Sequence, residues 1–534
     1  MEKRQFVIAT KYLWLPITKN VPNQAIAFLV DGIRQQEIYI GISEDTVDYY
    51  VAFSVEKYAG KRMDIEGDYT DSWVQKILQR NERPDYQNEK RPYLHYAPAF
   101  GWLNDPNGLL YDQGVFHIFH QHNPYGLEWE NIHWSYTSTK DFIHWSYTEP
   151  ALRPDCDGPI YSGTGLLDKY DLLGYGKHAY LYYYTSAGGR SAWSKNGKFT
   201  QRIAYSRDGN KSLSKSDCFC MPHVCDENRD PKVFYHEESQ AYIMVLYMTG
   251  FRFCFYRSVD LLNWVQTQEL EEKGMCECPD FFPLVDERTG DKKWIFWAAD
   301  GFYLIGDFDG YTFLPTSGRK EAYAICEREC VRAYAAQTVQ NINGRIVQIS
   351  WLTSHKENRN YTGVLSLPVQ LSLLSIGKEQ YVTLLPTEEV KAMRKKASQY
   401  NIEQEFHLPY EVQNEPMELE IHLQYQSKGH VTIEAFGQLI QVNFEEKMIE
   451  MSDRKSSFAE DSFLQENGLD FQMFFDQDVI EIYTMSGLKY FVQENKAEDV
   501  CGTLRLCGTE DTKGTIVIHE LEKVVMEENA SNNY

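Results

Sequence analysis

Apolar and polar residues alternate along the middle of the chain in a pattern that predicts paired β-strands. From roughly Arg91 to Leu371, a loop with a polar residue leads into an apolar strand, a turn and a second, aromatic-rich strand. Five copies occur, and their polar positions are Asp105, Ser162, Asp230, Glu277 and Tyr334. Repeats of roughly 50 residues built from strand pairs are typical of a β-propeller, because one blade cannot bury its faces without its neighbours. We therefore predict a five-bladed β-propeller over residues 89–384.

The segments on either side of these repeats also favour strands. Period-2 alternation in segments such as 417–423 and 479–483 predicts a C-terminal β-sandwich over residues 401–534. Strand-forming runs near the start predict a small β-sandwich-like domain over residues 1–88. The fold class is therefore expected to be all-β.

Two short connections are expected between these units. Residues 385–400 contain good helix formers behind a Thr387 cap, so we expect a connector helix or linker there. The polar, proline-containing stretch from Arg80 to Arg91 is the expected linker between the first domain and the propeller.

Charge and cysteine content narrow the classes of partner and compartment. The chain of 534 residues carries a net charge of -24, which disfavours approach to phosphate backbones, so no nucleic-acid partner is expected. No apolar run is long enough for a membrane span, and no secretory signal is recognised, so we expect a cytoplasmic protein unless a signal was trimmed. The 11 cysteines are an odd number and favour reduced thiols, which agrees with that compartment. The two sandwich domains offer surfaces for a homo-oligomer.

One cysteine cluster permits a second interpretation. Cys218, Cys220, His223 and Cys225 could hold zinc, but their spacing matches no common zinc finger. Buried or surface thiols are the favoured interpretation, and we predict no metal and no cofactor.

Three carboxylates stand in the same local setting. Asp105 and Asp230 each precede a proline, and Glu277 lies one residue ahead of Cys278 and Pro279. A following proline excludes the α region and fixes the backbone direction of the residue before it. Taken singly, each acid is better explained as part of a turn or a local ion pair. Their placement at corresponding points of three blades instead predicts that they meet at one end of the central channel of the propeller.

Two carboxylates can hydrolyse a glycosidic bond when one is ionised and the other carries a proton. Asp105, surrounded by asparagines, is expected to be the ionised nucleophile. Glu277, beside apolar residues, is expected to be the proton-carrying acid. Asp230 is then expected to hold sugar hydroxyls more tightly as charge develops in the ring.

Four ordered motifs at blade spacing resemble glycoside hydrolase family 32, the invertases, levanases and exo-inulinases. They are Trp102-Leu-Asn-Asp-Pro-Asn-Gly, Tyr161-Ser-Gly-Thr, Arg229-Asp-Pro and Glu277-Cys-Pro-Asp. The resemblance implies a propeller followed by a sandwich, and a double displacement at the fructosyl carbon of sucrose or a levan- or inulin-type fructan. It implies the same roles for the three acids and a reaction that needs no metal. It also implies a sugar-binding set: Asn104, Gln121, Trp129, Tyr161, Ser162, Arg229, Cys278 and Tyr334.

Two departures from the family pattern concern the region beyond the fructose. Glu130 stands where the family commonly has glycine, and Arg332-Ala333 replaces an Asp-Phe or similar pair. The leaving-group preference therefore stays open. Beside hydrolysis, two alternatives also stay open: a fructosyltransferase that uses a sugar acceptor in the same site, and a non-catalytic glycan-binding propeller.

Overall fold

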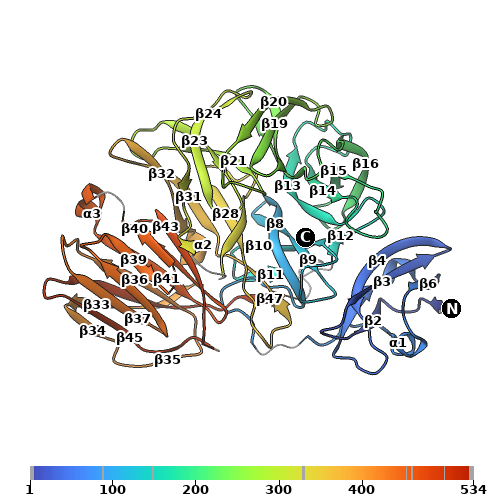
Figure 1. The fold of residues 1–534 in the computed structure, drawn as a ribbon, viewed down its shortest axis with the longest axis horizontal. Coiled ribbons are helices and arrows are strands. Elements are labelled where there is room, and N and C mark those ends of the chain that lie inside the picture. The colour runs from blue at the N-terminus through green and yellow to red at the C-terminus, as the bar shows by residue number, and fades with distance from the viewer. Residues whose placement is uncertain are drawn as a thin grey trace.

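The computed structural model is almost entirely β-structure and contains three units (Figure 1). It describes residues 5–86, 90–146, 150–326, 331–452, 454–458, 461–497 and 499–527, so part of the predicted linker, residues 87–89, lies outside it. Among the helices within these ranges, none is long and apolar enough to cross a membrane.

Five sheets follow one another from Gly101 to Pro386, and each contains an antiparallel path of four strands. The first contains β8 (Gly101–Asp112), β9 (Val115–Asn123), β10 (His133–Thr139) and β11 (His144–Ser146). The second contains β13 (Ile160–Asp168), β14 (Ala179–Ala187), β15 (Phe199–Ser206) and β16 (Ser214–Met221). The third contains β17 (Arg229–His236), β18 (Ala241–Thr249), β19 (Arg252–Ser258) and β20 (Val265–Glu271). The fourth contains β21 (Asp280–Val285), β22 (Lys292–Trp297), β23 (Phe302–Phe308) and β24 (Phe313–Pro315). The fifth contains β27 (Ala333–Thr338), β28 (Ile346–Leu352), β31 (Val369–Ile376) and β32 (Glu379–Pro386).

The first strands of the five sheets form a closed ring. The Gly163 N–H on β13 donates to the Asn107 side chain on β8, and the Thr164 hydroxyl donates to the Pro231 carbonyl on β17. A buried Lys232–Asp280 ion pair of 2.6 Å joins β17 to β21.

Two more contacts complete this ring. Asp280 accepts from the Thr338 N–H on β27, and the Gln340 N–H donates to the Leu109 carbonyl on β8. The sheets correspond in chain order to the five predicted repeats.

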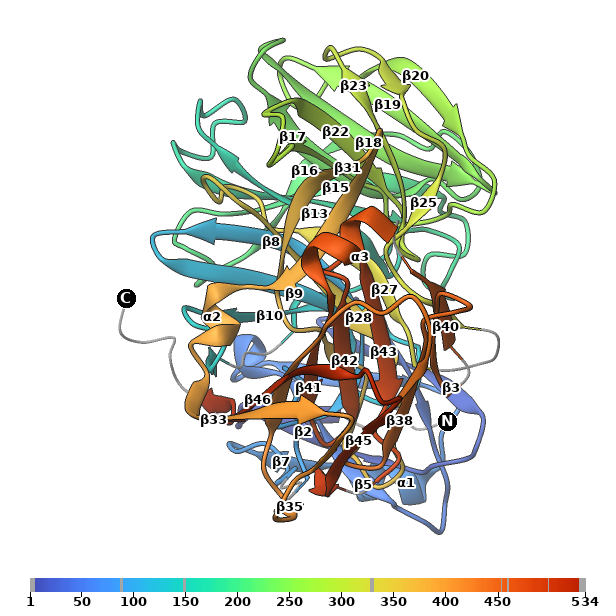
Figure 2. The same ribbon diagram turned by 90° about the vertical axis from the view of Figure 1, so that its left-hand side faces the viewer.

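The C-terminal unit is one hydrogen-bonded path of thirteen strands that folds into two layers (Figure 2). Ile433 and Ile440, near one end of the path, share a core with Leu419 and Phe471, near the other. In path order the strands are β26 (Ile325–Cys326), β40 (Arg454–Ser457), β39 (Met448–Met451), β38 (Gln438–Asn443), β37 (His430–Ala435), β45 (Leu504–Gly508), β34 (Glu405–His407), β33 (Arg394–Glu403), β46 (Lys513–Leu521), β36 (Met417–Leu423), β41 (Leu469–Phe475), β42 (Val479–Thr484) and β43 (Lys489–Glu494).

The predicted connector helix over residues 385–400 is wrong for most of its length. Helix α2 spans only Glu388–Lys391, the Thr387 side chain makes no capping hydrogen bond, and β33 begins at Arg394. The segment pairs with β46 from Arg394 onward, so the sheet hydrogen bonds override its helix propensity. The last described strand, β47 (Val525–Glu527), leaves the sandwich and pairs with β11 of the first propeller sheet.

A buried polar cluster fixes the sandwich to the propeller. Asp476 accepts hydrogen bonds from the backbone N–H groups of Tyr93, Leu94 and His95. The His95 ring lies between Asp476 and Glu481, at 2.6 Å from each carboxylate. Burial alone would lower the pKa of His95, but the two carboxylates raise it to about 10.

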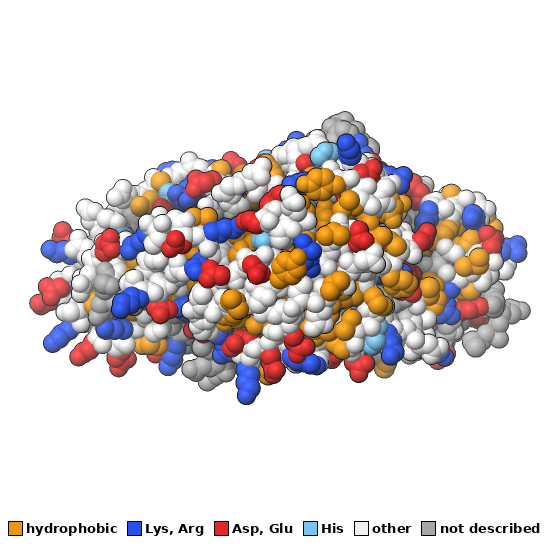
Figure 3. Space-filling view, turned by 90° about the horizontal axis from the view of Figure 1, so that it is seen from above, with side chains coloured by type: hydrophobic (Ala, Val, Ile, Leu, Met, Phe, Trp, Pro, Cys, Tyr) orange, Lys and Arg blue, Asp and Glu red, His pale blue; other side chains and the backbone are white. Residues whose placement is uncertain are grey.

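The N-terminal unit is a small two-sheet domain (blue in Figure 1). One sheet contains β1 (Gln5–Val7), β6 (Arg62–Gly67), β3 (Asn23–Val30) and β4 (Ile33–Gly41), and the other contains β5 (Tyr49–Ser54), β2 (Tyr12–Ile17) and β7 (Leu78–Arg80). Apolar side chains of both sheets and of helix α1 (Asp71–Gln75) form its core. The face seen from above shows acidic and basic side chains interspersed with apolar ones (Figure 3).

Candidate active site

The three predicted acids lie at the same end of the ring of first strands. Asp105 is on β8, where the pairing with β9 is irregular, Asp230 is on β17, and Glu277 precedes β21. Asp230, Glu277 and Cys278 have positive φ values of 62°, 55° and 37°. Such values are strained for residues other than glycine and occur often at functional sites.

Asp105 accepts hydrogen bonds from two neighbouring side chains. The Ser162 hydroxyl donates to Oδ2 at 2.5 Å, and the Asn104 amide donates to Oδ1 at 3.2 Å. Gln121 holds both donors, since its Oε1 accepts from Asn104 and its Nε2 donates to Ser162, each at 2.6 Å. The carboxylate is therefore held in one orientation by a chain of side chains from the first two sheets.

Asp230 is buried and lies against Cys278 and Arg229. The Cys278 N–H donates to Oδ2 at 3.2 Å, and Arg229 Nε lies 3.6 Å from the same oxygen. The Asp230 N–H donates to the Thr185 hydroxyl at 3.0 Å, which fixes the backbone. Burial, together with the charges of Asp105 and Glu277, outweighs Arg229 and raises the pKa of Asp230 to about 7.

Glu277 is partly exposed, with a side chain 34% exposed, whereas Asp230 is buried. Its Oε1 accepts from the Arg229 guanidinium at 2.6 Å, and its Oε2 accepts from the Tyr334 hydroxyl at 2.5 Å. The guanidinium lies 4.5 Å from the centre of the Tyr247 ring. Burial and the adjacent Glu277 raise the pKa of the Tyr334 hydroxyl, so it keeps its proton and donates.

The Cys278 thiol links the two buried acids. Its sulfur lies 3.5 Å from Asp105 Oδ2 and 3.6 Å from Asp230 Oδ2. Burial, and then the neighbouring carboxylates, raise the pKa of this thiol well above its usual value, so it stays protonated. A neutral donor therefore lies between two groups that would otherwise repel each other.

The pKa of Asp105 shifts in the direction opposite to that expected from the asparagines beside it. Burial raises the pKa of Asp105, and the bonds from Ser162 and Asn104 lower it only in part. The prediction considered the asparagines beside Asp105 but could not include its desolvation within the folded ring. Burial therefore shifts the pKa values of Asp105 and Asp230 in the same direction, upward.

Two of the predicted sugar-binding residues lie at the rim. Trp129 is 50% exposed, and its ring centre is 6.2 Å from that of Tyr161 in an edge-on arrangement. Glu130 is partly buried beside them, and this burial raises its pKa. The other predicted residues, Asn104, Gln121, Ser162, Arg229, Cys278 and Tyr334, all belong to the hydrogen-bonded network around the acids.

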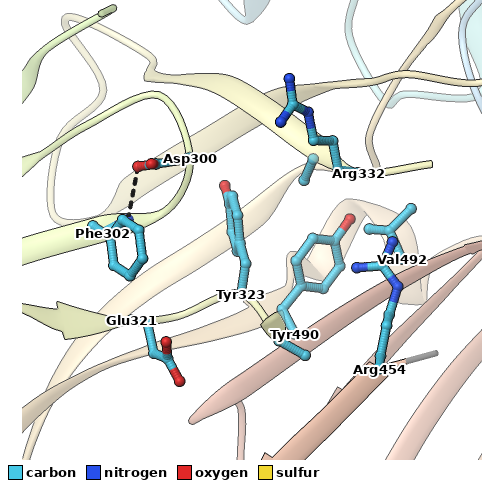
Figure 4. Close-up of a pocket in the computed structure, with 10 residues that line it drawn as sticks. Asp300, Phe302, Glu321, Tyr323, Arg332, Arg454, Tyr490 and Val492 are labelled. Carbon is cyan, nitrogen blue, oxygen red and sulfur yellow. Dashed lines mark hydrogen bonds between the residues drawn. The ribbon is translucent and has the colours of Figure 1, made fainter. Parts of the chain in front are cut away.

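Arg332 connects this network to a cavity between the propeller and the sandwich (Figure 4). Its guanidinium lies 4.8 Å from the centre of the Tyr334 ring. The cavity has a volume of about 190 Å³ and is lined by Asp300 and Tyr323 from the propeller side and by Arg454 and Tyr490 from the sandwich. Burial raises the pKa of Asp300 to about 6.

Two residues of the site were missed from the sequence. Thr185 supports the Asp230 backbone, and Tyr247 lies under Arg229. Both are on the second strands of their sheets, β14 and β18, among many tyrosines and aliphatic residues that pack in the core. Only the pairing of Tyr161 with Thr185 and of Arg229 with Tyr247 across neighbouring strands distinguishes them.

Among the described residues, two groupings could hold a metal ion, and neither includes the three acids. They are Asp155, Cys156 and Asp157, and Glu418, Glu420 and His519. In the second grouping, Arg394 already forms ion pairs with both glutamates. In the cysteine cluster noted above, Cys218 pairs with the Ser216 hydroxyl and Cys225 donates to the Met248 carbonyl.

Known proteins resemble this chain in sequence and in fold. A model of the "Glycosyl hydrolases family 32 N-terminal domain" matches residues 95–385. A levanase of Bacillus subtilis (strain 168) is 30% identical over 336 residues, which cover 58% of this chain and 48% of that protein. An invertase of Debaryomyces hansenii is 33% identical over 317 residues, which cover 54% of this chain and 56% of that protein. The chain thus spans about half the length of these curated relatives.

The crystal structure of exo-inulinase from Aspergillus awamori matches with a TM-score of 0.70 at 21% identity. The match covers 82% of this chain and 100% of the other. This likeness confirms the all-β fold of a propeller and a sandwich.

Proposed function

Because this chain belongs to glycosyl hydrolases family 32, we propose that it is a retaining β-fructofuranosidase acting on terminal β-D-fructosyl residues of sucrose, fructo-oligosaccharides or fructans. The observation that carries the proposal is the convergence of Asp105, Asp230 and Glu277, from three sheets, on one network of donors. Its relatives include a levanase and an invertase, whose names point to this substrate class.

Asp105 is the proposed nucleophile. The hydrogen bonds from Ser162 and Asn104 orient its carboxylate, and Oδ2 is the oxygen bound by Ser162. In its ionised form, this group attacks the fructosyl carbon and gives a covalent fructosyl-enzyme. Hydroxyl groups of a bound sugar bring donors to the carboxylate, and such donors favour its ionised form.

Glu277 is the proposed general acid and base. It is the acid that reaches the accessible side of the site, where a leaving group departs and water enters. It protonates the departing oxygen in the first step and takes a proton from water in the second. Arg229 and Tyr334 hold its two oxygens, so the same carboxyl group keeps its position through both steps.

Asp230 is the proposed stabiliser of the transition state. Its buried position beside Cys278 and Arg229 suits hydrogen bonds to the ring hydroxyls of fructose, which strengthen as positive charge develops on the sugar.

The test is release of free fructose from sucrose, inulin and levan by the wild type and by Asp105→Ala and Glu277→Gln. Glu271→Gln, on the exposed strand β20, is the control. The proposal expects fructose from at least one substrate, a loss of about 100-fold or more in each active-site variant, and no loss in the control. Absence of fructose from every substrate, or full activity in both variants, would reject it. Product analysis separates hydrolysis from transfer to a sugar acceptor.

A further inference from the structure

One strand of the N-terminal domain, β4, lies against the rim of the site. The Tyr39 N–H donates to Asn131 Oδ1 at 2.7 Å, and Asn131 Nδ2 donates back to the Tyr39 carbonyl at 2.8 Å. Asn131 directly follows Trp129 and Glu130 in the loop between β9 and β10. The strand therefore clamps the loop that carries the exposed tryptophan of the rim.

The side chains of the same strand hold a second loop, residues 188–198 between β14 and β15. The Trp193 N–H donates to Glu37 at 2.9 Å, and the Ala192 N–H donates to the Tyr39 hydroxyl at 2.6 Å. That hydroxyl in turn donates to Glu37 at 2.9 Å. The Glu37 side chain is only 5% exposed, and Arg34 pairs with it at 2.7 Å.

A buried carboxylate is costly unless it is paired and hydrogen-bonded. Glu37 meets both conditions through contacts that join two domains. Deeper in the interface, Gln36 lies within hydrogen-bond distance of His133, at 2.8 Å, and of the Tyr125 hydroxyl, at 3.1 Å. The contact between domains is thus a built polar interface.

The two loops face each other across Tyr161. Trp129 from the first loop approaches the Tyr161 ring, and Phe199, at the end of the second, approaches it at 5.6 Å between ring centres. Arg190 lies 5.5 Å from the centre of the Phe199 ring. These groups lie outside the network that surrounds the acids, and Trp129 is half exposed at the rim.

We propose that Tyr39 and Glu37 are positioning residues for the sugar units beyond the terminal fructose. By fixing the Trp129–Glu130 loop and the 188–198 loop, β4 shapes the leaving-group side of the site and favours substrates whose leaving group is a sugar or an oligosaccharide. Aromatic faces and fixed polar groups are what such a subsite requires. The proposal rests on the proposed function.

The test compares substrates that differ only in the leaving group, using the full chain. Methyl β-D-fructofuranoside places methanol there, sucrose a single sugar, and a short levan-type oligosaccharide several sugars. The variants are Tyr39→Phe and Glu37→Gln, which change the side-chain contacts of β4 with the 188–198 loop and leave the Tyr39 backbone bonds to Asn131 in place. Glu56→Gln is the control, because Glu56 forms an exposed ion pair with Lys11 elsewhere on the same domain.

The expected result is a rise in KM of about three- to tenfold for the oligosaccharide, in line with the loss of one or two hydrogen bonds. A smaller rise is expected for sucrose, and kcat and the methyl fructoside kinetics should stay unchanged. Trp129→Ala should give the same order of substrates with a larger effect. Thermal melting of each variant verifies that the domain stays folded.

Equal losses on all three substrates, or no loss on any, would overturn the inference. A wild-type protein that releases no fructose from any of the three would instead reject the proposed function, and with it this inference. The two failures are therefore distinguishable from the wild-type control alone.

Discussion

The buried Asp230 should lower the free energy of unfolding of the protein increasingly as pH rises. Its pKa is about 7 in the folded protein, against about 3.9 in an unfolded chain. Between these values the folded state retains a proton that the unfolded chain releases, so stability falls as pH rises from about 4 to 7. The gap of about 3 in pKa, at about 1.4 kcal/mol per unit, amounts to about 4 kcal/mol.

Asp230→Asn removes this titration while it conserves size and hydrogen-bonding capacity. We expect the variant and the wild type to be about equally stable near pH 4. We expect the variant to gain up to about 4 kcal/mol by pH 8. Its kcat/KM should fall by about 100-fold or more, because the neutral amide cannot stabilise developing positive charge.

The assay is urea unfolding followed by tryptophan fluorescence at pH 4.5, 6 and 8. Asp260→Asn is the control, since hydrogen bonds at an exposed turn, mainly from Asn263, outweigh burial and lower the pKa of Asp260 to about 2. That group contributes stability that is lost only as pH falls through its low pKa, so the control should be destabilised by a similar amount at all three values. An Asp230→Asn gain that does not grow with pH, or a loss of stability at pH 8, would refute the reasoning.

Three further variants probe single contacts. Ser162→Ala removes a donor that lowers the pKa of Asp105. We expect kcat/KM to fall by about tenfold and the acidic limb of the pH–rate profile to move to higher pH. An acidic limb that does not move would contradict this role of Ser162. Tyr334→Phe removes the hydroxyl bound to Glu277; steady-state kinetics on sucrose should show kcat about tenfold lower with KM little changed, and a change confined to KM would contradict a role in the chemical step. His95→Gln leaves Asp476 and Glu481 buried without their cation. The raised pKa of His95 stabilises the fold fully below a pH of about 6.5, and this stability is lost as pH rises through about 10. The free energy of unfolding of the variant should therefore be about 3–5 kcal/mol lower than that of the wild type at pH 6, and the difference should be smaller at pH 10. An equal difference at both pH values would count against the buried ion cluster.

Strand periodicity and repeat spacing predicted the parts of the fold that depend on local pattern. The polar positions at 105, 162, 230 and 334 all fall within the first strand of a sheet, and Glu277 lies just before one. The connector failed because pairing of β33 with β46, distant in sequence, outweighed local helix propensity. The return of β47 to the first sheet is likewise a long-range contact that no local pattern signals.

The sequence could predict which residues of the site meet, but not the pKa values of the acids. The motifs brought Asp105, Asp230 and Glu277 together, yet the pKa values depend on burial in the ring and on Cys278 Sγ between two acids. The role of Asn131 was equally hidden, because its partner Tyr39 lies in another domain. Burial and contacts between domains arise only when the whole chain is folded.

The central claim is that Asp105 and Glu277 carry out a double displacement through a fructosyl-enzyme. Methanol added to a sucrose reaction can intercept that intermediate, and proton NMR identifies the anomer of the methyl fructofuranoside formed. The account predicts the β anomer as the only initial product, with none formed by Asp105→Ala. The α anomer as the initial product would mean a single displacement with inversion and would contradict the account.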